Sequence, residues 1–549
     1  MKICVLFVVL FLASPAWSAT YWVSKSGLDS NACFNSASEP TLSTQSRLTI
    51  AAGITCLAGG DTLKIKAGTY AEGDFANSIP AGTSWAAATT IQAAEAGVII
   101  QPSSGLRIVY HSTVRSNFII WDGSGGIGTY WLVLDGLNQT SDCVKIDSGS
   151  NYVRIQQAEI KNCHNQGFLT AASNLEFLNN KVHDIIETGG SPQHPFYIGG
   201  SPTGLKINGN DIYDSFETVN GYGVQFFGEP STGANEFKRN WIHAGSAIVC
   251  LLVGSPTDNG TVAYNICESN AAGVGFGGTI GPNFFHNTVY SSANTGIQLA
   301  NANTVDIDNN LIVSSGNPGI DILATHETGS RIRNNMIYSA TGTDIANADG
   351  ADVTITGNLC ESGTGTSDCT ESGLTAAFAD PATHNFSIGA TNSCIDQGLN
   401  IGQPFNGPAP DCGAFETIVL LSATVENGDA NTIRTTWENN VHPPLRPASG
   451  ATGFSARVNA GARNVTAVTR VGDDKFYLTI DGAAVVAGQT VDFSYTGTGT
   501  ATDSALIGSL WNQNLPAKTN QAVTNNVSAA GQKFNATGKW TTTGKMVVQ

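Results

Sequence analysis

The sequence has few charged side chains and no cluster of basic ones. Asp, Glu, Lys and Arg make up 13% of the 549 residues, and the net charge is −17. That share is about half of what globular domains usually carry. Nucleic acids and anionic membrane surfaces are bound by clustered Lys and Arg. The sequence therefore argues against both partners, whereas a local basic patch could still bind an acidic polysaccharide.

Long apolar runs are missing after the N-terminus. The only such run is ICVLFVVLFLA at 3–13, which follows Lys2 and precedes the small residues Ala16 and Ser18. This pattern predicts a signal peptide over 1–18 and a secreted mature chain, either extracellular, periplasmic or on the cell surface. No later stretch approaches the roughly 18 apolar residues that a membrane span needs. We therefore expect no membrane span.

CxxC spacing, the usual sign of a structural zinc site, is also absent. Of the 11 cysteines, Cys4 lies in the apolar run and the others fall in close pairs along the chain. Exported proteins usually oxidise such pairs to disulfides. We predict nearest-neighbour disulfides and no metal. The predicted pairs are Cys33–Cys56, Cys143–Cys163, Cys250–Cys267, Cys360–Cys369 and Cys394–Cys412.

What is present is a repeat, from about residue 130 onward. Two short apolar runs separated by a Gly or Asn break are followed by an Asn near a turn, and the unit recurs at intervals that suit one coil of three short strands. Asn tolerates left-handed backbone at tight corners, and stacked Asn amides can hydrogen-bond from coil to coil. The recurring residues are Asn180, Asn210, Asn240, Asn265, Asn287, Asn310, Asn335 and Asn358.

The apolar runs alternate with period two, which sorts their side chains into buried and exposed columns. We expect the following to point inward: Val144, Phe168, Phe196, Val224, Val249, Val274, Ile297 and Ile320. We expect the following to form an outward column: Lys145, Leu169, Tyr197, Gln225, Cys250, Gly275, Gln298 and Asp321. A second outward column, on the next face, is predicted to contain Arg154, Glu176, Lys206, Glu236, Asp306 and Arg331.

The two ends of this region resemble a known superfamily. YWVSKSGLDS at 21–30 with GGDTLKIKAGTYAEG at 59–73 is similar to the opening of pectate-lyase-like right-handed β-helix proteins. CIDQG at 394–398 with PDCGAFE at 410–416 resembles their closing signature. The resemblance implies an all-β chain whose residues 19–416 form a right-handed parallel β-helix, capped by a helix near 48–57. It implies no single function, because lyases, hydrolases, epimerases, esterases and adhesins share this fold.

After residue 416 the Asn repeat stops and longer alternating strands begin. Turn signals separate these strands at the spacing of a β-sandwich. Residues 417–516 resemble SwmB-type Ig-like repeats, which implies a small Ig-like β-sandwich. Its role is either to bind substrate or a surface, or to act as a spacer or cap. Residues 517–549 are predicted to be a tail that is poorly ordered or pairs with a sheet edge.

Chemistry is predicted on the first outward column, where SPQHPFYIGG at 191–200 belongs to a long coil. Removing the C5 proton of a uronate requires a cation for the carboxylate, a base and an acid. We assign these catalytic roles to Lys145, His194 and Tyr197, and predict cleavage of an acidic polysaccharide by β-elimination. The predicted substrate-binding residues are Gln225, Glu217, Tyr222, Glu229, Arg154 and Lys206. His183, Tyr213 and His243 recur at one corner position and are interpreted as structural.

Two other functions remain open at this point. A glycoside hydrolase needs two carboxyl groups at a suitable separation, and Asp306, Asp308 and Asp321 are the candidates. A non-catalytic adhesin or polysaccharide-binding protein would also fit the low charge and the C-terminal module. No compact acidic trio is present, so no cofactor is predicted and calcium is left open. We expect a monomer whose partner is a polysaccharide.

Overall fold

The computed structural model describes most of the chain between residues 18 and 527. The described residues are 18–75, 78–102, 107–112, 117–125, 130–139, 142–185, 193–200, 202–213, 221–227, 235–243, 249–254, 260–268, 271–277, 281, 283–313, 315–316, 318–323, 329–338, 340, 342–361, 369–371, 374–375, 378–380, 385–388, 391–416, 419–438, 454–470, 475–495 and 518–527. The predicted signal peptide lies almost wholly outside them.

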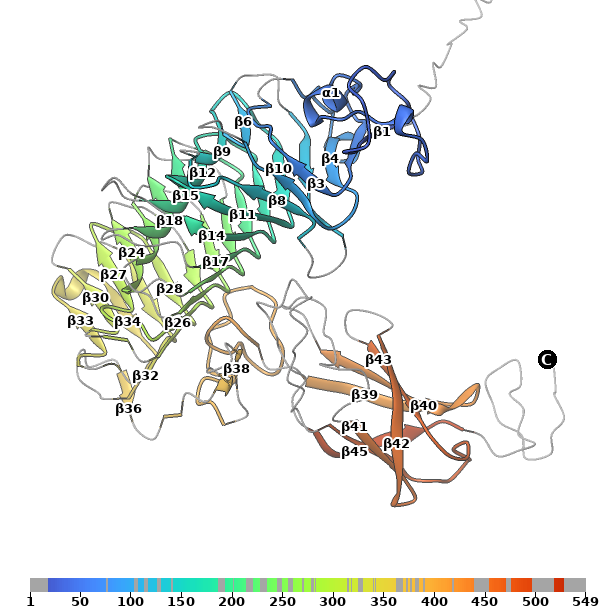
Figure 1. Cartoon of the computed structure of the whole chain (residues 1–549). Helices are drawn as coiled ribbons and strands as arrows, with labels where there is room; N and C mark the ends of the chain where they lie inside the picture. Colours follow the sequence, from blue (N-terminus) through green and yellow to red (C-terminus); the bar gives the residue numbers. More distant parts are fainter. Residues whose placement is uncertain are drawn as a thin grey trace, which may run out of the picture.

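The main body is a parallel β-helix, as predicted. Successive short strands fall in turn on three parallel sheets, here called A, B and C, so that each coil of the chain stacks on the previous one. Figure 1 shows the coils stacked from the blue N-terminal end to the yellow end. The apolar runs form short strands that are buried on one side. A single coil cannot bury them alone, whereas stacked coils can.

Sheet A carries the second predicted outward column. Its strands, in spatial order, are β1 (Thr20–Val23), β2 (Thr62–Ile65), β4 (Thr89–Ala93), β7 (Ile119–Asp122), β10 (Val153–Gln156), β13 (Glu176–Leu178), β16 (Lys206–Asn208), β19 (Glu236–Lys238), β22 (Thr261–Ala263), β25 (Asn283–Phe285), β28 (Asp306–Asp308), β31 (Arg331–Arg333) and β34 (Thr354–Thr356). The register aligns Arg154, Glu176, Lys206 and Glu236, and later Asp306 and Arg331, so that column is confirmed.

Sheet B follows sheet A after a short corner. Its strands are β3 (Gly68–Tyr70), β5 (Val98–Ile100), β8 (Leu132–Asp135), β11 (Ala158–Cys163), β14 (Lys181–Ile185), β17 (Asp211–Tyr213), β20 (Trp241–Ile242), β23 (Ile266–Glu268), β26 (Thr288–Tyr290), β29 (Leu311–Val313), β32 (Met336–Tyr338), β35 (Asn358–Cys360) and β36 (Cys369–Glu371). Its inward residues, such as Ile160, Val182 and Ile212, are buried.

Sheet C carries the first predicted outward column. Its strands are β6 (Val109–His111), β9 (Asp142–Ile146), β12 (Gln166–Thr170), β15 (His194–Gly199), β18 (Tyr222–Phe227), β21 (Val249–Val253), β24 (Ala272–Gly277), β27 (Ile297–Ala300), β30 (Ile320–Ile322) and β33 (Ile345–Asn347). On every strand but β21, the predicted inward residues are buried. The rings of Phe168 and Phe196 stack with centroids 4.5 Å apart.

The prediction is wrong for one strand of sheet C. In β21, Leu251 pairs with Val224 and Leu252 with Gln225, so Leu252 takes the outward place assigned to Cys250. Val249 is half-buried, and Cys250 is fully buried in its disulfide with Cys267. A shift of two residues preserves the alternation of buried and exposed side chains, so periodicity alone could not detect it.

The Asn repeat forms a buried ladder at the corner between sheets A and B. From Asn210 onward, each Oδ1 accepts hydrogen bonds from the backbone and side-chain N–H groups of the ladder Asn one coil earlier, for example Asn210 from Asn180 at 3.0 and 3.1 Å. The ladder prediction is therefore confirmed. The left-handed residue of each corner is the one before the ladder Asn, such as Asn179 or Gly209, not the ladder Asn itself.

A short helix closes the N-terminal end, as the resemblance implied. Helix α1 (Ile50–Ile54) begins after Thr49, whose hydroxyl accepts the N–H of Ala52. Buried Ile50 and Ile54 pack in the same cluster as Val23 of β1. The apolar end of the first coils is thus covered by the helix.

Residues 374–416 are called the closing segment. Its described residues pack against the later coils, over sheet B and the corner that joins it to sheet A. The segment contains the antiparallel pair β37 (Phe378–Asp380) and β38 (Asn385–Ile388). Phe386 and Phe415 join Tyr264 and Phe285 in one buried cluster, and the Cys394–Cys412 disulfide lies in another. All five predicted disulfides are formed.

The C-terminal strands form a small separate all-β unit. They are β39 (Val419–Glu426), β40 (Asp429–Glu438), β41 (Phe454–Val458), β42 (Gly461–Arg470), β43 (Lys475–Ile480), β44 (Val491–Tyr495) and β45 (Lys518–Asn525). Where two separate sheets were expected, hydrogen bonds close a barrel, because β42 pairs with both β41 and β43 and β45 with both β44 and β39. Strand β45 extends the unit beyond the predicted end at 516. No helix in the described residues is long and apolar enough to cross a membrane.

Candidate functional site

The outward residues of sheet C form a continuous column along the β-helix, here called the sheet C column. Register places Lys145 beside Leu169, Leu169 beside Tyr197, and Tyr197 beside Gln225. Neighbouring strands lie about 4.8 Å apart, so Lys145 and Tyr197 stand about 10 Å apart along the column. The structure thus places these residues on one face but two coils apart.

His194 lies at the start of β15 and is 2% exposed. Its ring stacks between Tyr197 and Tyr222, with both centroid distances 5.4 Å. Its Nδ1 is 3.1 Å from the backbone N and 3.3 Å from the backbone O of Tyr222, so this nitrogen is occupied by backbone. Burial lowers the pKa of His194 to about 4, and the ring is therefore neutral at neutral pH.

Lys145 belongs to a small group of aromatic and charged side chains. Its Nζ is 3.6 Å from Asp147 and 5.9 Å from the ring centre of Tyr110, one coil earlier. Arg107 lies 5.0 Å from the same ring and pairs with Asp142 at 3.2 Å. Two cations therefore flank one aromatic ring at this end of the sheet C column.

The predicted binding residues are not all on this face. Tyr222 and Gln225 are on β18, next to Tyr197, whereas Glu217 and Glu229 lie outside the described residues. Arg154 and Lys206 are on sheet A, where both pair with Glu176 at 2.5 and 3.1 Å. Of the predicted binding residues that the structure describes, only Tyr222 and Gln225 lie on the same sheet as the candidate catalytic residues.

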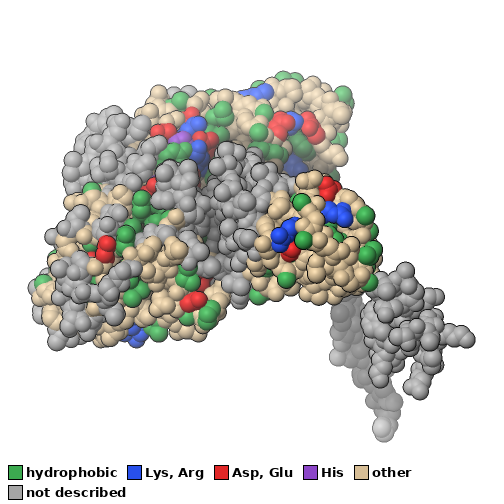
Figure 2. All heavy atoms as spheres, turned by 90° about the horizontal axis from the view of Figure 1, so that it is seen from below, with side chains coloured by type: hydrophobic (Ala, Val, Ile, Leu, Met, Phe, Trp, Pro, Cys, Tyr) green, Lys and Arg blue, Asp and Glu red, His purple; other side chains and the backbone are tan. Residues whose placement is uncertain are grey.

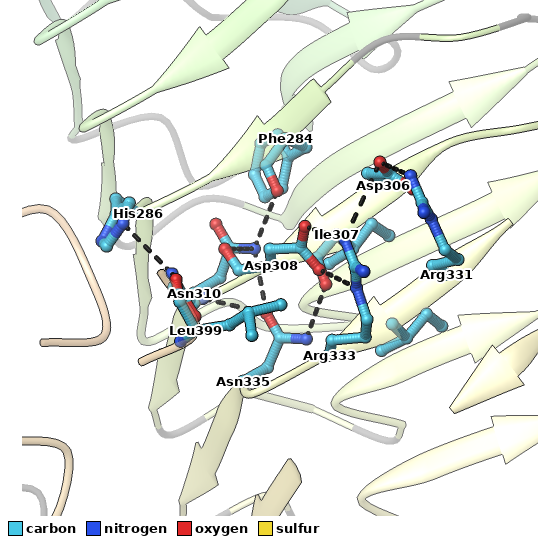
Figure 3. Close-up of polar contacts among 12 residues, drawn as sticks. Phe284, His286, Asp306, Ile307, Asp308, Asn310, Arg331, Arg333, Asn335 and Leu399 are labelled. Carbon is cyan, nitrogen blue, oxygen red and sulfur yellow. Dashed lines mark hydrogen bonds and ion pairs between the residues drawn. The ribbon is translucent and has the colours of Figure 1, made fainter. Parts of the chain in front are cut away.

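The three carboxylates considered for a hydrolase lie on two different sheets. Asp306 and Asp308 lie on sheet A and are each bound by an arginine of the next strand, Arg331 and Arg333 (Figure 3). Burial raises the pKa of Asp308, while Arg333 opposes that rise. Asp321 lies on sheet C, where it accepts a hydrogen bond from Gln298 at 3.1 Å. The register thus places Asp306 and Asp308 on one strand of sheet A and Asp321 on a different face.

Among the described residues, no group of three or more His, Cys, Asp or Glu side chains is placed to hold a metal ion.

The comparisons with known proteins agree with this architecture. The family model "Right handed beta helix region" matches residues 272–377. The chain has that fold. A search of curated protein sequences gave no match. The family match covers only part of the main body, and the rest of the β-helix is assigned from its strand register.

Several solved structures resemble the chain at low identity. The pectate lyase Pel9A is 17% identical, covering 72% of this chain and 96% of its own, with a TM-score of 0.45. XylC in complex with xylose is 11% identical over 66% and 87%, with a TM-score of 0.39. A rhamnogalacturonan lyase is 14% identical over 66% and 91%, also with a TM-score of 0.39. Likeness at this level says nothing about a reaction.

A second polar group, on sheet B of the β-helix, was not predicted as a site. It consists of Glu159, Lys161, Lys181, His183, Asp211, Tyr213, Trp241 and His243, here called the sheet B cluster. Histidine, basic and acidic side chains gather on the β-helix face seen in Figure 2. The signal in the sequence was a His or Tyr three residues after Asn180, Asn210 and Asn240 in successive coils.

Proposed function

We propose that the chain is a secreted polysaccharide lyase-like enzyme that cleaves a uronate-containing polymer by β-elimination on the sheet C column. The observation that supports it best is Tyr197, a half-buried phenol in that column, packed against the neutral imidazole of His194. An extended polymer can follow such a column, because the outward residues repeat at the strand spacing.

Tyr197 is proposed as the residue that moves the proton. As phenolate it takes the C5 proton, the electron pair forms the C4–C5 double bond, and the C4–O bond breaks. The phenol then returns the proton to the leaving oxygen. His194, buried and held by backbone, acts as a positioning residue that fixes the ring of Tyr197. His194, predicted from the sequence to be an acid or a base, is thus proposed to be a positioning residue instead.

Lys145 is proposed to bind a carboxylate of the polymer. About 10 Å of column separates it from Tyr197, so it would hold a sugar away from the reacting one. Gln225 and Tyr222 would contact the polymer on the other side of Tyr197. This arrangement predicts that Lys145 contributes mainly to binding and Tyr197 mainly to the chemical step.

The test is incubation of the mature protein with a panel of uronate polysaccharides, followed by ultraviolet absorbance of the unsaturated product. On a substrate that is cleaved, Tyr197→Phe should lower kcat roughly 100-fold or more. Lys145→Ala should chiefly raise KM, and His194→Ala should lower kcat less than Tyr197→Phe does. Tyr338→Phe, on sheet B, is the matched control and should keep wild-type rates.

Other outcomes would assign other functions. New reducing ends without ultraviolet absorbance would identify a hydrolase, and retention of polymer without cleavage would identify a binding protein. Wild-type kcat in Tyr197→Phe would disprove the assigned role of this residue even if the lyase reaction were found.

A further inference from the structure

Four rings of the sheet B cluster stack in one row along the β-helix. His183 and Tyr213 are register partners, with ring centroids 4.8 Å apart and planes 3° from parallel. Tyr213 and His243 follow at 5.1 Å, and Trp241 lies 3.6 Å from His243. The spacing of the first three rings is that of neighbouring strands, so the stack is a direct product of the coil register.

Charged side chains of the neighbouring column pair with these rings. Glu159 lies 2.9 Å from His183 Nε2, and Asp211 lies 2.9 Å from His243 Nε2. Lys181 Nζ lies 5.3 Å from the ring centre of Tyr213. The rings of His183, Tyr213 and His243 therefore each have a charged group beside them. Along the β-helix these charged groups are an acceptor, a donor and again an acceptor.

Two members of the cluster are well buried although they lie on an outward sheet face. The side chain of Glu159 is 19% exposed and that of His183 is 9% exposed. The hydrogen bond from His183 lowers the pKa of Glu159 to about 2, so its carboxylate stays ionised. Removing charges from water is unfavourable, and plain solubility would be served by exposed charges instead.

The later strands of sheet B show the alternative use of the same face. There the equivalent outward positions hold apolar residues such as Leu311, Val313 and Met336, and the closing segment packs on them. Trp241 lies at the boundary, because it also packs against the cluster of Phe386 and Phe415. The closing segment thus borders the sheet B cluster at Trp241.

The charges of the sheet B cluster select among polymers. Lys161 and Lys181 both lie within 4.0 Å of Glu159. Besides Glu159 and Asp211, two more carboxylates contact the rings: Asp184 lies 2.7 Å from His183 Nδ1, and Glu268 lies 2.9 Å from Trp241 Nε1. Acidic groups therefore outnumber the lysines, and such a face gives no Coulomb attraction to a polyanion. Alternating donors and acceptors beside aromatic rings match instead the hydroxyl groups and apolar faces of neutral sugars.

We propose that the sheet B cluster is a second carbohydrate-binding site, which takes a neutral, hydroxyl-rich polysaccharide and is separate from the sheet C column. It anchors the protein to a neutral polymer while the sheet C column faces another chain. Two sites on separate faces raise the local concentration of polymer at each. The site stands whether or not the sheet C column is catalytic.

The test measures binding of the full mature protein to soluble galactomannan and β-glucan, and to polygalacturonate as the acidic comparison. The wild-type protein should bind at least one neutral polymer with little dependence on salt. Tyr213→Ala should weaken that binding about tenfold. Tyr338→Ala, at the equivalent position of β32 under the closing segment, is the matched control. Tyr197→Phe should leave binding to neutral polymers unchanged.

Lys181→Met gives a second variant that keeps the ring stack, and it should also weaken binding. Thermal unfolding of each variant verifies that the β-helix is intact. The proposal is overturned if both cluster variants fold and bind as the wild type does, or if the wild-type protein binds no neutral polymer. Retention only by the acidic polymer, lost in high salt, would also overturn it.

Discussion

At the scale of single residues, the side chains of the ladder Asn residues connect successive coils by hydrogen bonds. Asn240 is fully buried, and its Oδ1 accepts from both the backbone and the side chain of Asn210 at 2.9 Å. Its Nδ2 donates to the backbone O of Ile207 at 2.7 Å. The same Nδ2 also donates to Asn265 Oδ1 at 3.0 Å, so one amide links three coils. Buried polar groups need such partners.

Asn240→Ala should therefore be strongly destabilising. The substitution leaves the N–H of Asn210 and the carbonyl of Ile207 buried without partners, which should cost roughly 2–5 kcal/mol of unfolding free energy. Thermal or denaturant unfolding measures the loss. Asn294→Ala, at an exposed position, is the control and should change stability by less than about 0.5 kcal/mol. Equal stability of the two variants would show that the ladder amides contribute little.

At the scale of elements, the outer face of sheet B has two parts: the closing segment packs on the later strands, and polar side chains occupy the earlier ones. The closing segment covers the later strands and is joined to them by Asn309, whose side chain exchanges two hydrogen bonds with the backbone of Leu399 at 2.7 and 2.8 Å. Asn309 also has a positive φ of 56°, which a glycine can adopt freely. This residue thus combines a corner conformation with attachment of the segment.

Asn309→Gly separates these two roles, because it keeps the corner conformation and removes both side-chain hydrogen bonds to Leu399, while the backbone bond from Gly413 N to the carbonyl of residue 309 can remain. We expect faster proteolysis within 374–416 and a loss of roughly 1–3 kcal/mol in stability. Asn179→Gly is the control, since Asn179 is an exposed corner residue with a φ of 55° and lies far from the segment in sequence. Unchanged proteolysis in Asn309→Gly would mean that apolar packing alone holds the segment.

At the scale of the whole molecule, buried titratable groups tie stability to pH. Burial lowers the pKa values of His111, His194 and His286 to about 4. Unfolding restores ordinary values near 6.5, so the unfolded chain binds more protons between these limits. These histidines therefore stabilise the fold above about pH 6.5, and that stability is lost as the pH falls toward 4.

Glu416, where the closing segment ends, has the opposite effect. Burial raises its pKa to about 9, helped by Asp411, and its Oε1 lies 3.8 Å from His286 Nδ1. The folded state then binds the extra proton, so stability declines as the pH rises from about 4.5 to 9. Together these groups place maximal stability near pH 6–7.

Glu416→Gln should flatten the alkaline side of that profile. The amide cannot ionise, so the loss of thermal stability between pH 7 and pH 9 should be smaller than in the wild type. Between about pH 4.5 and 7 the stability of the variant should rise with pH more steeply than that of the wild type, because the opposing contribution of Glu416 is gone. Glu39→Gln, at an exposed side chain, should keep the wild-type profile. If Glu416→Gln follows the wild-type curve over this range, the carboxyl is ionised in the folded protein at neutral pH.

Much of the architecture was predictable from spacing along the chain. The repeated Asn and the period-two runs predicted the ladder and the β-helix, because both depend on neighbouring coils of similar length. The close spacing of the cysteines along the chain predicted all five disulfides. The sheet C column was predicted with one error, at Cys250, because a two-residue slip leaves the alternation intact.

The site depended on contacts that spacing does not specify. Lys145 and Tyr197 share a column by register, but whether His194 is exposed, and whether an arginine binds Asp308, follows from packing between coils. The closing segment covers the apolar part of sheet B and meets the sheet B cluster at Trp241, which spacing along the chain could not show. Sequence alone determined the coil period, because that is local; tertiary structure decided burial and pairing, because these depend on what covers each face.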